Sequence, residues 1–372
     1  MKILLIGEYS NVHWTLAEGL RVLGHEVTVF SNGDFWKNYH RDLSLVRTPT
    51  KIGGICYLLH LYKMLPRLQG YDVVQVINPM FLELQAKRIL PVYRYLRKHN
   101  GKVFLCALGM DYYWVNMCSS VMPLRYSDFN IGMKLRTNEE AINEQNDWMG
   151  TEKELLNKYI ANDCDGIITG LYEYWACYEP NFKQKTTFIP LPIKPYWPSE
   201  GNEFVCSHSP RIKVFIGINK QRNAYKGTDI MLTAAQEIEK KYPKCIELVK
   251  VESMPYHEYC KIMNGSDAIL DQLYSYTPSM NSLLAMSKGI ICIGGGEPEN
   301  YEILNEQTLR PILNVEPNYE SIYSVLENFV LHPECVRQLK ADSISYVRKH
   351  HDYVKVAQQY LDFYKRCGAV ER

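Results

Sequence analysis

The sequence predicts an α/β protein built from two Rossmann-like domains. Short apolar runs alternate with longer segments of helical spacing in both halves of the chain, the pattern that builds parallel sheets covered by helices. A proline-rich stretch, residues 190–210, interrupts this alternation near the middle. The length of 372 residues exceeds the usual size of one hydrophobic core and independently favours two domains.

The first domain is expected over residues 1–195, as a series of β–α–β units. In its first helix Val12, Leu16 and Leu20 share one face, Asn11 or Ser10 can cap the start, and Gly24 ends it. Short apolar runs predict strands at residues 3–6, 27–30, 73–77, 103–105, 166–169 and 187–189. We therefore expect a parallel sheet.

Two segments break the alternation. Residues 117–150 are polar and contain Pro123 and Gly132, so we expect a lid-like insertion in the first domain. The prolines within residues 190–210 remove backbone donors and fix φ, so this stretch is expected to be the domain boundary.

The second domain is expected over residues 205–350, where the alternation restarts. The predicted strands are residues 213–216, 246–251, 268–270 and 290–293, and the predicted helices are residues 227–242, 256–264 and 279–288. A final helix within residues 351–372 places Val354, Ala357, Leu361 and Tyr364 on one face. We expect this helix to cross back to the first domain.

Composition narrows the class of protein. The 42 Lys and Arg nearly balance the 41 Asp and Glu, so nothing favours a nucleic-acid partner. The 11 cysteines are scattered and form no CxxC pair, which favours reduced thiols in a cytoplasmic protein. The apolar run 3–6 stops at Gly7 and Glu8, and no run reaches the ~18–20 residues of a spanning helix. We expect a soluble cytoplasmic protein.

Two strand ends in the first domain carry candidate site residues. Gly7 and Asn11 lie at the first strand–helix junction, where open α/β sheets bind ligands, and His13 follows as a candidate general base. Asp111 follows the strand 103–105 and precedes the rings of residues 112–114, a combination that suits a sugar. The alternatives are an ordinary capped turn, a surface histidine and core aromatic side chains.

Two junctions in the second domain carry candidate anion sites. The loop 215–227 holds Asn219, Lys220, Arg222 and Lys226, and such a cationic loop can bind a diphosphate. A second helix start offers Ser279 and Asn281. A solvated run of charge is the alternative for the loop. The pattern Asp163-Cys164-Asp165 matches D-x-D metal sites but precedes a strand, so we expect no metal there.

These segments together resemble the GT-B-fold glycosyltransferases, and within them the retaining family 4 (glycosyl transferases group 1). Residues 1–7 and the GHEV turn at 24–27 are similar to the opening of that family. Three further matches are the loop 215–227, the strand and helix at 268–272 and 283–289, and the glycine-rich loop 294–299. The resemblance implies two domains facing across a cleft.

The resemblance also implies roles for single residues. Lys226 matches the residue that contacts the donor diphosphate, while Ile218 stands at the place of the family's loop arginine, so Arg222 or Lys220 would replace it. The family's two glutamates align with Tyr276 and Leu284, and ribose binding would move to Glu297 or Glu299.

The implied activity is transfer of a hexose from a UDP- or GDP-sugar to a hydroxyl of a saccharide or lipid-linked saccharide. The resemblance implies a retaining, metal-independent enzyme of surface polysaccharide or glycan biosynthesis that uses no cofactor. Two alternatives stay open: a non-catalytic sugar-nucleotide-binding subunit and a sugar-nucleotide epimerase of the same fold.

A peripheral contact with the inner face of the membrane is a further prediction. The segment preceding the fourth strand combines cations with apolar and aromatic side chains, a composition that suits an anionic lipid surface, although a solvated helix face has the same composition. The residues concerned are Arg94, Arg97, Lys98 and Lys102, with Tyr93, Tyr95 and Leu96.

Overall fold

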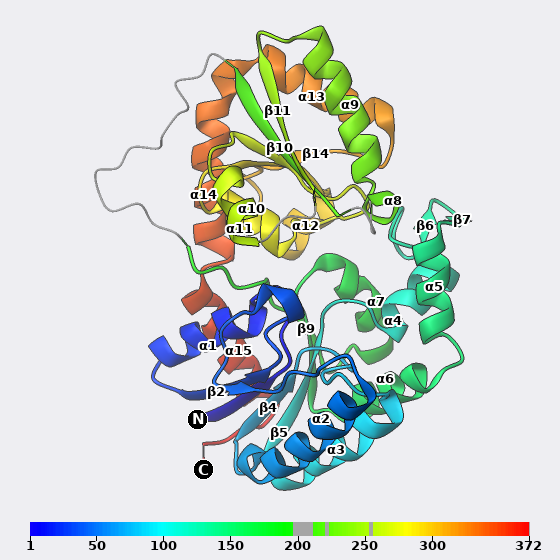
Figure 1. The fold of residues 1–372 in the computed structure, drawn as a ribbon. Helices are drawn as coiled ribbons and strands as arrows, with labels where there is room; N and C mark the ends of the chain where they lie inside the picture. Colours follow the sequence, from blue (N-terminus) through cyan, green and yellow to red (C-terminus); the bar gives the residue numbers. More distant parts are fainter. Residues whose placement is uncertain (196–210, 220–222, 253–255, 372) are drawn as a thin grey trace. The chain divides into compact units, whose positions relative to one another are not determined.

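The computed structural model describes residues 1–195, 211–219, 223–252 and 256–371, which form two units (Figure 1). Unit 1 contains Met1–Val121, Asn143–Pro192 and the C-terminal segment from Tyr353. Unit 2 contains Met122–Ile142 and Ile193–Asp352.

Unit 1 is built on a seven-stranded sheet in the order β3-β2-β1-β4-β5-β8-β9, with every neighbouring pair parallel. β4 and β8 are buried at every position, as expected for parallel strands covered by helices on both faces. The strands are β1 (Lys2–Ile6), β2 (Glu26–Ser31), β3 (Leu43–Ser44), β4 (Val73–Val76), β5 (Lys102–Ala107), β8 (Gly166–Thr169) and β9 (Thr186–Phe188).

Helices of unit 1 connect these strands, and the C-terminal helix packs beside the first one (Figure 1). A Cβ at Gly19 would lie 2.3 Å from the Tyr353 carbonyl oxygen, so glycine permits this close approach. The Tyr364 hydroxyl donates to Gln75 of β4 at 2.8 Å. The helices are α1 (Val12–Val22), α2 (Lys51–Met64), α3 (Ala86–His99), α4 (Tyr112–Asn116), α6 (Glu152–Asp163), α7 (Tyr172–Phe182) and α15 (Tyr353–Arg366), while α5 (Glu139–Trp148) begins in the segment assigned to unit 2 and ends in unit 1. The predicted return of the C-terminal helix is confirmed.

Unit 2 is built on a five-stranded parallel sheet in the order β11-β10-β12-β13-β14. The strands are β10 (Ile212–Ile218), β11 (Ile246–Glu252), β12 (Ala268–Leu270), β13 (Ile291–Gly294) and β14 (Leu313–Asn314). The helices are α8 (Asn223–Lys226), α9 (Thr228–Lys241), α10 (Tyr256–Met263), α11 (Met280–Met286), α12 (Pro298–Ile303), α13 (Tyr319–Leu331) and α14 (Val336–His350). Its core lies between the sheet and α9 and α13, where Val214, Ile216 and Leu326 are buried.

The segment 122–142 differs from the prediction that it belongs to the first domain. It joins unit 2, where it forms the antiparallel hairpin of β6 (Asn130–Ile131) and β7 (Lys134–Leu135). Contacts of Arg125 and Arg136 with other parts of unit 2 explain this placement. The division at Pro192–Ile193 falls inside the proline-rich stretch, of which residues 196–210 lie outside the described residues.

Candidate functional site

The order of strands in unit 2 reverses between β10 and β12. In open α/β sheets ligands bind where the carboxyl ends of two such strands part. β10 leads into Asn219, which is exposed, and β12 leads into Asp271. The loop after β10 was the predicted diphosphate site. Two of its candidate cations, Lys220 and Arg222, lie outside the described residues.

The turn formed by Lys226 and Gly227 is held against the segment that follows β12. The Lys226 carbonyl accepts a hydrogen bond from the Leu273 N–H at 2.9 Å. Gly227 has φ +70°, and a Cβ there would lie 2.7 Å from the Leu273 Cβ. Glycine thus meets both a conformational and a steric need, and it fixes half-buried Lys226 beside the β12 exit.

Arg136 brings a second cation to this turn, and the sequence alone did not indicate it. Its guanidinium donates to the carbonyl of Ala224 at 2.8 Å and to that of Tyr225 at 3.1 Å. It also lies 3.5 Å from the centroid of the Tyr274 ring. Arg136 therefore joins the end of α8 to the β12 exit, next to Lys226.

The glycine-rich loop after β13 packs tightly on the same segment. A Cβ at Gly295 would lie 2.2 Å from the Ser275 carbonyl oxygen, so no larger residue fits. The Glu297 N–H donates to the Tyr276 carbonyl at 3.1 Å. The segments that follow β12 and β13 are consequently held together at the carboxyl ends of these strands.

Glu297 and Glu299, the predicted ribose acceptors, are both held by Arg125. Arg125 contacts Glu297 at 2.7 Å and Glu299 at 2.5 Å. Glu297 is 5% exposed and also accepts from the Tyr126 hydroxyl and the Asn314 amide. Both carboxylates are therefore engaged with other side chains of unit 2.

Tyr276 takes part in the same cluster, at the position where the resemblance places a glutamate. Its hydroxyl accepts from the Arg125 backbone N–H at 2.6 Å, and its ring lies 4.8 Å from the Tyr126 ring, centroid to centroid. Leu284, at the second glutamate position, lies on α11 and is half-buried.

At the start of α11, the Ser279 N–H that was predicted to be free for a phosphate already has a partner. The Asp271 carboxylate accepts from the Ser279 N–H at 3.3 Å and from its hydroxyl at 3.1 Å. A phosphate would compete with this internal anion, so the prediction for Ser279 requires correction. The Asn281 amide donates to the Tyr259 hydroxyl at 2.7 Å, and a Cβ at Gly217 would lie 2.4 Å from the Tyr259 ring.

Unit 1 has its own reversal of strand order, between β1 and β4, and a pocket of about 130 Å³ lies at their carboxyl ends. Gly7 lies at this point with φ +84°, and a Cβ there would lie 2.3 Å from Ile77 Cγ2. The polar side chains of the pocket include Glu8, Asn32 and Glu83, and its aromatic ones Tyr9, Phe35 and Tyr57.

Glu8 is a candidate functional residue that the sequence reasoning missed. Its carboxylate accepts from the backbone N–H groups of His13 at 3.2 Å and Trp14 at 2.9 Å, at the start of α1. Burial raises its pKa to about 8, despite these hydrogen bonds. A carboxyl group that titrates near neutral pH in a pocket is typical of functional sites.

His13 faces the sheet, which corrects its predicted orientation toward an open cleft. The ring is fully buried, with Nδ1 2.8 Å from the Gly7 carbonyl and Nε2 3.0 Å from the Gln75 amide nitrogen. A carbonyl only accepts, so Nδ1 carries the proton and Nε2 accepts from Gln75. Burial lowers the pKa of His13 to about 3, so the ring is neutral and its lone pair is in use.

Asp111 also has structural partners. Its carboxylate caps α4 by accepting from the Trp114 N–H at 2.9 Å, and it accepts from the Tyr178 hydroxyl at 2.6 Å. Burial raises its pKa to about 6. Asp111, predicted as an acid beside sugar-stacking rings, is therefore a buried cap in an aromatic core. Asn11 precedes α1 with φ +69° and donates to the Thr15 hydroxyl at 3.2 Å.

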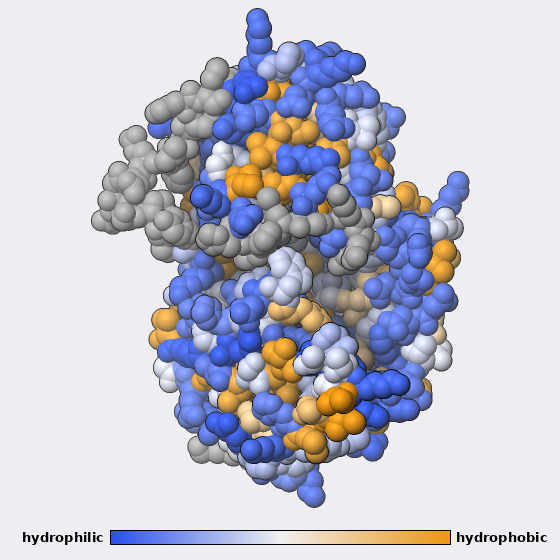
Figure 2. All heavy atoms as spheres, in the orientation of Figure 1, coloured by the Kyte–Doolittle hydropathy of each residue, from blue (hydrophilic) through white to orange (hydrophobic). Residues whose placement is uncertain are grey.

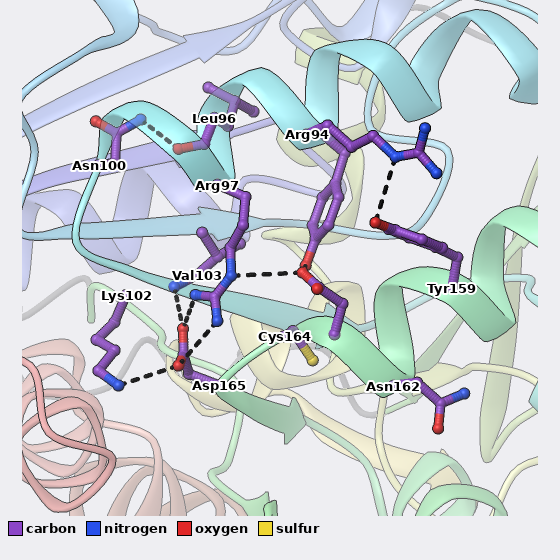
Figure 3. A network of polar contacts seen from close by, with 12 residues as sticks. Arg94, Leu96, Arg97, Asn100, Lys102, Val103, Tyr159, Asn162, Cys164 and Asp165 are labelled. Atoms are coloured by element: carbon purple, nitrogen blue, oxygen red, sulfur yellow. Dashed lines mark hydrogen bonds and ion pairs between the residues drawn. The ribbon is translucent and has the colours of Figure 1, made fainter.

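The carboxylates of the D-x-D pattern contact cations of the chain (Figure 3). Asp165 pairs with Arg97 and, at 3.1 Å, with Lys102, and Asp163 lies 3.4 Å from Arg97. Burial disfavours the Asp165 charge, but the hydrogen bonds from Arg97, the Val103 N–H and Lys102 together outweigh this effect, and the pKa of Asp165 lies below its usual value. Arg97, Lys102 and Asp165 line a hollow where β5 begins, at the end of the sheet opposite to the Glu8 pocket.

None of the described helices is both long enough and apolar enough to span a membrane. No protein-family model matches the sequence, and no curated protein matches it.

Solved structures match almost the whole chain. Sucrose-phosphate synthase from Thermosynechococcus elongatus has a TM-score of 0.62 at 12% identity, over 98% of this chain and 99% of that chain. Alr3699/HepE from Anabaena, in complex with UDP-glucose, has a TM-score of 0.58 at 12% identity, over 98% and 100% of the chains. The chain has the GT-B fold. The predicted fold class is thereby confirmed.

Another structure similar to this GT-B chain is a putative UDP-N-acetylglucosamine 2-epimerase from Listeria monocytogenes. Its TM-score is 0.56 at 10% identity, over 100% of this chain and 97% of that chain. At such identities the similarity establishes the GT-B fold alone. The activity depends on the side chains at the carboxyl ends of the two sheets.

Proposed function

We propose that the protein is a glycosyltransferase that moves a sugar from a nucleotide diphosphate sugar to a hydroxyl of a saccharide or lipid-linked saccharide. The observation that carries this proposal is a pair of sites in a GT-B chain, each at the carboxyl ends of the strands of one sheet. The site in unit 2 contains cations, and the site in unit 1 is a pocket with carboxyl groups. The solved structure of HepE contains UDP-glucose. The proposed pathway is the synthesis of a surface polysaccharide or other glycan.

The donor diphosphate is proposed to bind at the carboxyl ends of β10 and β12. Lys226 and Arg136 supply positive charge there, and Gly227 fixes the turn that carries Lys226. Fixed cations stabilise the negative charge that grows on a departing diphosphate. Because side chains of the protein supply this positive charge, the proposed reaction uses no metal.

The acceptor is proposed to bind in the Glu8 pocket of unit 1. Carboxyl and amide groups accept hydrogen bonds from sugar hydroxyls, and the rings of Tyr9 and Tyr57 offer apolar faces to sugar C–H groups. His13 and Asp111, the earlier candidates for a base, have their acceptor atoms engaged. We propose retention of configuration, which requires no base at either residue.

The test is incubation of the purified protein with radiolabelled UDP-, GDP- and ADP-sugars and a panel of saccharide and lipid-linked acceptors. We expect acceptor-dependent transfer from one donor, with NMR of the product showing a retained anomeric configuration. Nucleotide binding with neither transfer nor hydrolysis across the panel would instead indicate a non-catalytic binding subunit.

An epimerase is the second candidate, because a putative UDP-N-acetylglucosamine 2-epimerase shares the fold over the whole chain. An epimerase needs no acceptor, and this property distinguishes it from a glycosyltransferase. Accumulation of an isomerised nucleotide sugar in reactions without acceptor would establish this activity and exclude the transferase proposal.

A further inference from the structure

The outer face of α2 is an exposed apolar stripe. Four large side chains point outward, with exposed fractions of 74% for Ile52, 60% for Ile55, 66% for Leu59 and 59% for Tyr62. At 100° per residue these positions fall within about 80° of the helix circumference. Figure 2 shows hydrophobic side chains gathered over α2.

The opposite face of α2 already supplies what the fold needs. Tyr57, Leu61 and Met64 are buried against unit 1, so the outward residues add nothing to the core. A surface helix normally has a polar outer face, and a contiguous exposed apolar patch marks an interaction site. The stripe therefore indicates a partner.

The charge around the stripe indicates the chemistry of that partner. Between Asp42 and Asp72 the sequence contains no acidic residue, but it contains four basic ones. These are Arg47, Lys51, Lys63 and Arg67, and all are exposed. Lys51 and Lys63 flank the stripe at the two ends of the helix. An apolar stripe with a ring near one end and flanking cations suits an anionic lipid surface.

A second copy of the chain fits this face less well. A symmetric dimer brings the same patch of both copies together, so their flanking lysines would face each other across an apolar contact. Like charges in a desolvated interface repel, whereas anionic headgroups attract all four cations.

We propose that α2 docks the protein on an anionic membrane surface, with Ile52, Ile55, Leu59 and Tyr62 inserted at the headgroup boundary. Tyr57 of the same helix lines the Glu8 pocket, as does Phe35, which is 64% exposed and precedes exposed Trp36. Docking through α2 therefore places a helix that lines this pocket at the lipid surface.

The basic cluster of α3, the surface predicted from the sequence, is a weaker candidate. Arg97 is paired with Asp163 and Asp165, Lys102 is paired with Asp165, and Arg94 bonds the Tyr159 hydroxyl (Figure 3). Two of its four cations are thus neutralised by neighbouring carboxylates. Exposed Arg94 and Lys98 still provide a matched control for the α2 lysines.

The experiment is co-sedimentation of the full chain with phosphatidylglycerol–phosphatidylcholine vesicles and with pure phosphatidylcholine vesicles. It needs no sugar nucleotide, so its outcome is independent of the proposed enzymatic function. We expect binding to the anionic vesicles that weakens with salt. Each cation near such a surface strengthens binding about fivefold, so Lys51→Gln/Lys63→Gln should weaken it by about 25-fold. Ile52→Asp/Leu59→Asp should weaken it by more than about tenfold.

Two matched variants are expected to bind like the wild type. Leu155→Asp alters an equally exposed leucine, 61% exposed, on α6, and Arg94→Gln/Lys98→Gln removes two cations from α3. Melting followed by circular dichroism verifies that each variant is folded. Three results would overturn the proposal: no binding by the wild type, equal losses in the control variants, or a dimer in light scattering that Ile52→Asp/Leu59→Asp dissociates.

Discussion

Arg125 lies 2.7 Å from the buried carboxylate of Glu297, and this ion pair joins the segment 122–142 to the exit of β13 in unit 2. Glu297 retains the Tyr126 hydroxyl and the Asn314 amide as further donors. Glu297 is therefore a structural anchor of the segment, whatever contact it makes with a ligand.

We predict that Arg125→Ala loosens the segment while leaving unit 2 folded. Because two donors to Glu297 remain, the expected loss is about 1–2 kcal/mol of unfolding free energy. Hydrogen exchange in residues 122–142 should accelerate. Lys134→Ala removes a cation from the same hairpin and is the control. Unchanged exchange in Arg125→Ala would show that other contacts hold the segment.

Lys226→Ala and Arg136→Gln are each expected to weaken UDP or GDP binding. A charge-assisted hydrogen bond contributes about 1.5–3 kcal/mol, which corresponds to a loss of roughly 10- to 150-fold in affinity by calorimetry. The control is Lys240→Ala, which removes an exposed lysine from the last turn of α9 and should leave nucleotide binding unchanged. Unchanged affinity in Lys226→Ala would exclude the proposed diphosphate position.

The sequence predicted the sheets better than the site. Gly166–Thr169 and Ala268–Leu270 are short apolar runs with sharp limits, and both are strands with the predicted bounds. The helix α2 was not predicted, because apolar residues such as Ile52 and Leu61 occupy both of its faces and leave no helical period.

The site residues depend on contacts that no local pattern contains. Arg136 and Arg125 lie in a polar, weakly periodic segment, and their partners are more than 80 residues away. His13 lies in the first helical turn, as predicted, but the direction of its ring depends on Gln75 of β4. Glu8 required knowledge of the pocket that it lines.

A comparison of Gly7 with Gly24 distinguishes the backbone strain of replacing a glycine from the steric overlap of the added Cβ. Both have a positive φ, +84° and +86°, but a Cβ at Gly7 would lie 2.3 Å from Ile77 Cγ2, whereas nothing lies within 4 Å at Gly24. Gly24→Ala should lose about 1–2 kcal/mol of unfolding free energy from backbone strain alone. Gly7→Ala should lose a further 1–3 kcal/mol or so from overpacking. Equal losses in urea denaturation would contradict the close approach at Gly7.

Glu8 makes stability depend on pH in a direction opposite to that of His13. Burial raises the pKa of Glu8 from 4.5 to about 8, so between these values the folded state holds a proton that the unfolded state releases. The free energy of unfolding therefore falls as pH rises through this window, by about 1.4 kcal/mol per pH unit. The pKa of His13 is lowered to about 3, so its contribution rises with pH and is complete above about pH 6.5.

Of these two groups, only Glu8 contributes between pH 6.5 and 8, so we compare the wild type with Glu8→Gln there. The wild type should lose about 2 kcal/mol relative to the variant over this interval, on top of a constant offset from the lost hydrogen bond. Glu83→Gln removes the other carboxyl group of the pocket and is the control. Parallel curves for the wild type and Glu8→Gln would mean that Glu8 is ionised in the folded protein at pH 6.5. A difference of the same size between the wild type and Glu83→Gln would mean that the pH dependence is not specific to Glu8.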